Sequence, residues 1–163
     1  MNQQIKKYLA SYYETEVSEI DLLLSKEIAT SFLLIWPIFE QTLFDGFCTK
    51  GDLTKISTKS TFSKSYNEIF SYFHQRYKDK QKYHNLRHND TYEFADSILN
   101  KEIDEITDKE KMQFITYVVY RYRNNIFHGN KGLNSWLNYN KEIEYCILFM
   151  IESLNNKKNK LTL

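Results

Sequence analysis

Apolar residues recur along most of this chain at the spacing of α-helices. Near the N-terminus they stand at positions 5, 8, 9 and 12, which form one stripe of a short amphipathic helix. A longer apolar stretch begins near Ser18 and reaches Phe47, and between residues 32 and 39 it is apolar on nearly all sides. This stretch predicts a central helix. Pro37 is expected to kink that helix or split it in two, because proline removes a backbone hydrogen-bond donor.

The middle of the chain alternates between polar and apolar segments. Residues 49–61 are polar without periodicity and predict a loop, whereas residues 62–77 carry the apolar stripe of a helix. That helix runs into the charged residues 78–88, whose polarity leaves helix and loop both open. Asp90, with Glu93 three positions later, predicts the start of the next helix.

Two further helices are predicted in the C-terminal third. Thr107 and Glu110 have the spacing of a capping box, and the helix that they open has an apolar face as far as Ile126 and a stop at Gly129. After a loop, residues 143–154 carry a regular apolar stripe, and the polar tail from residue 155 is expected to fray. The sequence has no strand alternation and no internal repeat. The pattern therefore predicts one all-α domain, residues 1–163, built as an up-and-down bundle of five or six helices.

Composition narrows the classes of function. Four glycines and one proline argue against an all-β protein rich in tight turns, and a net charge of +1 provides no general attraction for nucleic acid. Cys48 and Cys146 lie far apart without metal-ligand spacing, which indicates buried free thiols in a reducing cytosol. The N-terminus lacks the apolar core of a signal peptide, and the longest apolar run is too short to span a bilayer. We therefore expect a cytoplasmic protein that does not enter the membrane.

Candidate chemistry gathers near the end of the helix that precedes Gly129. At about 100° per residue, one stripe of this helix carries Arg121, Asn124, Asn125 and His128. Arg123 lies roughly 140° around the helix from His128, so the two act together only if His128 has left the helix or if the site is shared with a second copy. An arginine fork and a histidine suit phosphoryl chemistry. The same side chains would also stabilise the C-terminal helix dipole without any further function.

The segment from Arg123 to Gly129 resembles the signature of the HEPN superfamily, an arginine, four to six residues, then a histidine, with a polar residue after the arginine. Its sequence, Arg-Asn-Asn-Ile-Phe-His-Gly, and its position at the end of a late helix both fit that signature. The resemblance implies a helical bundle that pairs into a homodimer, so that two motifs form one composite site. It also implies metal-independent cleavage of RNA with no cofactor.

By this resemblance, Arg123 would hold the scissile phosphate and Asn124 would be the supporting polar residue. His128 would transfer a proton while the RNA 2′-hydroxyl attacks, leaving a 2′,3′-cyclic phosphate. Arg121 also falls within the family's spacing from His128, so the choice between Arg121 and Arg123 stays open. Glu40, on the predicted central helix, either pairs with one of these arginines and positions it or faces water.

A basic segment follows residue 75 and interleaves cations with tyrosines, as suits an RNA backbone and stacked bases. Its candidate RNA-binding residues are Arg76, Lys78, Lys80, Lys82 and Arg87. A solvated helix end explains the same charges. His84 and His88 have the spacing of a metal-binding pair, with His74 as a conceivable third ligand, but no acidic residue stands between them and we predict no metal site.

The sequence thus predicts an endoribonuclease of the toxin or defence type, acting as a homodimer and controlled by an antitoxin or another regulatory protein. The alternative is a non-catalytic HEPN-like dimerising module that binds RNA, a nucleotide or a protein partner. A third reading is an ordinary helical partner-binding protein with a coincidental motif.

Overall fold

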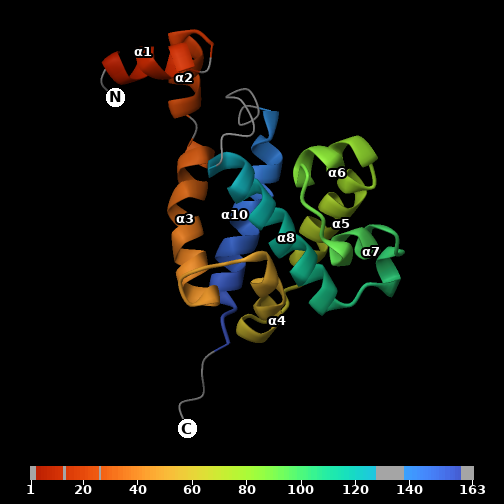
Figure 1. Ribbon diagram of the computed structural model, residues 1–163. Helices are drawn as coiled ribbons and strands as arrows, with labels where there is room; N and C mark the ends of the chain where they lie inside the picture. The colour runs from red at the N-terminus through yellow and green to blue at the C-terminus, as the bar shows by residue number, and fades with distance from the viewer. Residues whose placement is uncertain (1–2, 13, 26, 128–137, 159–163) are drawn as a thin grey trace.

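Helices make up nearly all the regular structure of the computed structural model, which describes residues 3–12, 14–25, 27–127 and 138–158 (Figure 1). Within these ranges there is no strand, and a single isolated β-bridge joins Ser60 to Lys157. The helices are α1 Gln3–Tyr12, α2 Val17–Leu24, α3 Glu27–Phe44, η1 Lys50–Lys55, α4 Ile56–Lys59, α5 Tyr66–Tyr77, α6 Lys80–Arg87, α7 Glu93–Leu99, η2 Ile103–Glu105, α8 Asp108–Phe127 and α10 Asn140–Asn155. The predicted all-α class is confirmed, with more short helices than the five or six expected.

The core lies between three long helices and α5. α10 packs along α3, and α5 packs against α8 (Figure 1). Large rings fill the space between them: the ring centroid of Phe149 on α10 lies 5.0 Å from that of Tyr66 on α5 and 6.3 Å from that of Phe39 on α3. On another side of α8, α6 and α7 pack against it. α8 therefore presents different residues to different neighbours, which decides where its polar side chains go.

The N-terminal helices form a small unit of their own. α1 and α2 pack on each other around the buried Ala10 and Ile20, and Figure 1 shows them at one end of α3, apart from the rest of the bundle. An ion pair between Lys6 and Asp21 joins the two helices at 2.5 Å. The sequence predicted a single helix through both α2 and α3, but α2 ends at Leu24 and α3 begins at Glu27.

Of the two outcomes predicted at Pro37, a kink or a split, the split does not occur, because α3 continues through this residue. Pro37 and Leu33, four residues earlier, both lie on the exposed side of α3. The Leu33 carbonyl, which loses its usual donor at Pro37, is on the side where water can replace that donor.

Three other local predictions were also wrong. The expected loop at residues 49–61 contains η1 and α4, which are anchored by the fully buried Leu53 and Ile56. Asp90 does not cap a helix: α7 begins one residue after Tyr92, and the Asp90 carboxylate binds side chains from other elements instead. Residues 156–158, expected to fray, pair with the segment after α4, where Thr61 N donates to the Asn156 carbonyl at 2.9 Å.

The capping box that opens α8 is confirmed. Thr107 N donates to Glu110 Oε2 at 2.8 Å, and Glu110 N donates to Thr107 Oγ1 at 3.3 Å. These two bonds satisfy donors that every helix start leaves open, so they fix where α8 begins. No helix in the described residues is both long enough and apolar enough to cross a bilayer.

Candidate functional site

Arg121 and Arg123 point to different neighbours of α8. Two residues along a helix correspond to a rotation of about 200°, so their side chains leave α8 on nearly opposite sides. Arg121 points toward α6, where it meets the end of that helix. Arg123 points toward α3, where its guanidinium carbon lies over the ring of Trp36. The two arginines that the sequence left as alternatives thus belong to two separate environments.

Arg121 is engaged by the C-terminal end of α6. It is only 8 % exposed, and its guanidinium donates to the carbonyls of Leu86 at 3.3 Å and Arg87 at 2.8 Å. A third bond reaches Asp90 Oδ2 at 3.2 Å. Asn125, one turn further along the same stripe, donates to the Leu86 carbonyl at 3.1 Å. These side chains satisfy carbonyls that the end of α6 leaves without helical partners, which is a structural role.

Arg123 is partly buried and lies against an aromatic surface. Its guanidinium carbon is 5.6 Å from the centroid of the Trp36 ring, within the range of a cation–π interaction. Its Nη1 donates to Asn124 Oδ1 at 2.9 Å. Asn124 therefore supports Arg123 directly and does not share the Asn125 contacts on α6, although the predicted stripe grouped the two asparagines together.

Glu40 is bound through both of its carboxylate oxygens. Oε2 accepts from the indole N–H of Trp36 at 3.1 Å, and Oε1 accepts from the backbone N–H of Cys48 at 2.9 Å. The sequence left two readings of Glu40, an arginine partner or a solvated side chain. The contacts of its two oxygens tie it to the same tryptophan that lies under Arg123.

The Cys48 thiol is buried near the charged side chains of Glu40, Asp52 and Arg123. It is 3 % exposed, and its pKa is raised to about 12, first by burial and then by the negative charges of Glu40 and Asp52. The positive charge of Arg123 acts in the opposite direction and lowers that pKa. Glu40 contacts Cys48 directly through the backbone N–H of that residue, and both Glu40 and Arg123 contact Trp36. A thiol with so high a pKa stays protonated at neutral pH and is no nucleophile.

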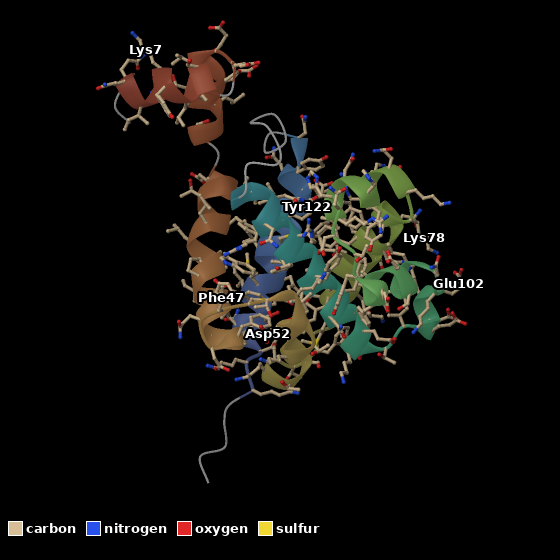
Figure 2. All side chains as sticks on the ribbon, in the orientation of Figure 1. Lys7, Phe47, Asp52, Lys78, Glu102 and Tyr122 are labelled. Carbon is tan, nitrogen blue, oxygen red and sulfur yellow. The ribbon has the colours of Figure 1, made fainter. Side chains whose placement is uncertain are left out.

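His128 and Gly129 lie outside the described residues, as does the predicted helix stop. The structure follows α8 as far as Phe127 and resumes at residue 138, shortly before α10. Tyr122, labelled in Figure 2 near this end of α8, has its ring centroid 6.1 Å from that of Tyr139. The two described segments that flank His128 are thus close to one another.

The candidate RNA-binding residues are dispersed over several neighbours. Arg76 forms a 2.9 Å ion pair with the buried Glu142, and Arg87 lies 5.4 Å from the Tyr83 ring centroid and 3.9 Å from Asp96. Lys82 pairs with Asp79, the N-cap of α6, at 3.4 Å.

Lys78 and Lys80 line a hollow of about 170 Å³ with Tyr77, Tyr83 and residues of α7. Lys78 lies 4.0 Å from Glu102. Phe47 follows the C-terminal end of α3, the end away from α2. Figure 2 shows Lys78 on the opposite side of the molecule from Phe47. Lys78 is therefore distant from that end of α3.

The three histidines that were weighed as metal ligands, His74, His84 and His88, have different environments. His74 is buried and its Nε2 donates to the Ile98 carbonyl at 3.1 Å, while burial lowers its pKa. His84 is exposed on α6, and His88 follows the end of that helix with a positive φ of 50°. Among the described residues, no group of three or more histidine, cysteine or acidic side chains is arranged to hold a metal ion.

Sequence reasoning did not single out Trp36. The available signal was the spacing of Trp36 and Glu40, because residues four apart lie on one helix face and can form a hydrogen bond. The resulting arrangement is an arginine of intermediate burial that contacts an indole and an amide, which suits the binding of an anionic group. The chain matches no protein-family model, no curated protein and no solved structure.

Proposed function

We propose that this protein is a metal-independent endoribonuclease, with Arg123 and His128 as its catalytic residues and Asn124 as their supporting residue. The observation that carries the proposal is the different use of the two candidate arginines. Arg121 is committed to the carbonyls at the end of α6, whereas Arg123 is partly exposed and supported by Asn124 and Trp36. This difference favours Arg123, the arginine whose spacing and following asparagine gave the HEPN resemblance.

The chemistry follows from these groups. The Arg123 fork binds the non-bridging oxygens of a phosphodiester and stabilises the charge that develops on them. The 2′-hydroxyl attacks phosphorus, the bond from phosphorus to the 5′-oxygen breaks, and the imidazole of His128 transfers the proton. The products are a 2′,3′-cyclic phosphate and a free 5′-hydroxyl. The family resemblance implies a composite site, so we propose that Arg123 of one copy of the chain acts with His128 of a second copy.

The test is cleavage of a panel of single-stranded RNAs in excess EDTA by the parent protein and three single variants. Arg123→Ala and His128→Ala are expected to lower the cleavage rate by about 10²- to 10³-fold, since one removes a transition-state donor and the other a proton-transfer group. Arg121→Ala is the matched arginine control. It should lower the stability of the protein and not the cleavage rate of the folded protein. Cleavage that persists in both Arg123→Ala and His128→Ala would contradict the assignment.

A second candidate is a non-catalytic dimerising module that binds RNA, a nucleotide or a protein partner. It is favoured by the apolar residues that α3 and the following turn expose, namely Leu33, Leu34, Ile38 and Phe47. Exposed apolar surface of this kind marks interaction sites. RNA binding by the parent protein without cleavage at high protein concentration would support this candidate over the first.

A further inference from the structure

Trp36 is a buried residue whose polar atom and ring face both have specific partners. Only 3 % of it is exposed, yet its polar atom and one face of its ring are both in use. The indole N–H donates to Glu40 Oε2 at 3.1 Å, and the guanidinium of Arg123 lies over the ring at 5.6 Å from its centroid. A phenylalanine at this position would keep an apolar ring but would have no N–H to donate to Glu40.

Glu40 fixes the orientation of this indole. Its second oxygen accepts from Cys48 N at 2.9 Å, so the carboxylate is anchored to the turn that follows α3 as well as to Trp36. That turn is itself constrained, because Asp45 and Gly46 have positive φ values of 59° and 105°. A charge-assisted hydrogen bond to an anchored carboxylate restricts rotation of the ring about its side-chain bonds.

An oriented ring restricts the guanidinium above it. Arginine has several rotatable bonds, and the plane of its fork must be defined before it can bind a phosphate through two parallel hydrogen bonds. The guanidinium of Arg123 has two contacts that limit its freedom. Its carbon lies over the Trp36 ring, 5.6 Å from the centroid, and its Nη1 donates to Asn124 Oδ1 at 2.9 Å.

We infer that Trp36 is a positioning residue for Arg123 and that Glu40 acts on Arg123 through the Trp36 indole. The inference rests on the proposed function, because it assigns the phosphate-binding role to Arg123. It adds a connected series of contacts, from the turn after α3 through Glu40 and Trp36 to Arg123, that sets the direction of the arginine fork toward an RNA phosphate.

The first test examines the Trp36–Arg123 contact without RNA. The chain has two tryptophans, so Trp136→Phe leaves Trp36 as the sole source of tryptophan fluorescence. In that background, Arg123→Ala is expected to shift the emission of Trp36, because it removes a positive charge from the ring face. Arg121→Ala should leave that emission unchanged. If Arg123→Ala leaves the emission unchanged as well, the inference is overturned whether or not the protein cuts RNA.

The second test examines the effect of Trp36 on cleavage, at a temperature where circular dichroism shows every variant folded. Trp36→Leu removes the ring face, and its kcat is expected to fall by at least about tenfold with a smaller change in KM, because the fork is present but misdirected. Trp36→Phe keeps a ring face and should recover part of that loss. Phe70→Leu, another buried aromatic change that does not touch Arg123, is the control for lost packing.

The outcomes separate the inference from the proposed function. Equal kcat values in Trp36→Leu and Phe70→Leu would overturn the positioning role even if the parent is an active nuclease. If the parent does not cleave RNA, the proposed function fails, and the variants are compared for affinity to a single-stranded RNA oligonucleotide. Weakening by Trp36→Leu that matches Arg123→Ala would then support the positioning role, and unchanged affinity would overturn it.

Discussion

At the scale of the residue, the direction in which a side chain leaves α8 decides what it can do. Arg121 and Asn125 share one side and both donate to the Leu86 carbonyl, whereas Arg123 lies on the side of Trp36. The period of the helix separates the arginines before any tertiary contact is considered. Chemically equal residues two positions apart thus acquire a structural role and a candidate catalytic role.

This division predicts different costs for the two arginine-to-alanine changes. Arg121→Ala removes one donor from each of the Leu86 and Arg87 carbonyls and from the Asp90 carboxylate, and should lower the free energy of unfolding by about 2 kcal/mol because other donors remain at these acceptors. Arg123→Ala loses a cation–π contact and should cost about 1 kcal/mol. Urea denaturation followed by circular dichroism measures both. A larger loss for Arg123→Ala than for Arg121→Ala would contradict the assigned roles.

At the scale of the element, contacts within one helical turn could be predicted from the sequence, and contacts between distant segments could not. The Thr107–Glu110 box was predicted correctly because both partners lie within one helical turn. Asp90 has an equally suggestive spacing with Glu93, but its partners Lys50 and Arg121 lie 40 and 31 residues away. Those contacts draw the carboxylate away from the helix start, and no local pattern could reveal them.

The capping box also predicts how stability depends on pH. A hydrogen bond from Lys101 and the Thr107 backbone N–H lower the pKa of Glu110 from 4.5 to about 2. A carboxyl group whose pKa is lowered by folding contributes stability above its unfolded pKa, and loses that contribution as pH falls toward the folded value. Glu110→Gln should therefore lower the free energy of unfolding by about 1 kcal/mol at neutral pH.

The difference between Glu110→Gln and the parent should shrink as the pH is lowered from 4.5 to about 2, where the parent carboxyl is itself protonated. Urea denaturation across this range measures it. Glu93→Gln, at an exposed position in the first turn of α7, is the control for loss of a surface charge. A difference that stays constant across the range would show that the ionised carboxylate of Glu110 is not the stabilising form.

At the scale of the whole molecule, the hydrophobic pattern predicted the all-α class because the core stripes of α8 and α10 are regular. The Trp36–Arg123 contact was not predictable in the same way, since it joins α3 to α8 across the sequence and depends on how those helices pack. The pattern also predicted a central helix, apolar on nearly all sides, but one side of α3 is exposed. That side carries Leu34, 66 % exposed, and Ile38, 56 % exposed.

The exposed side of α3 is where we expect two copies of the chain to meet. It adjoins Trp36 on the same helix, so pairing there would bring two Arg123 groups into one assembly, as a composite site requires. Light scattering should give a mass of twice 19.7 kDa for the parent protein. The double variant Leu34→Glu, Ile38→Glu should be folded and monomeric, because both residues are exposed and charge opposes burial in an interface.

The control for this experiment changes exposed apolar residues elsewhere. Leu22 on α2 and Ile103 on η2 are 52 % and 43 % exposed, and their glutamate variants should remain dimeric. A parent that is monomeric at every concentration would remove the composite site and favour a helical partner-binding protein. A dimer that survives the α3 variant but dissociates on Leu22→Glu would move the interface to the α1–α2 unit. Cleavage measured on the monomeric α3 variant then decides the mechanism, because a site composed from two copies must lose activity in step with the loss of the dimer.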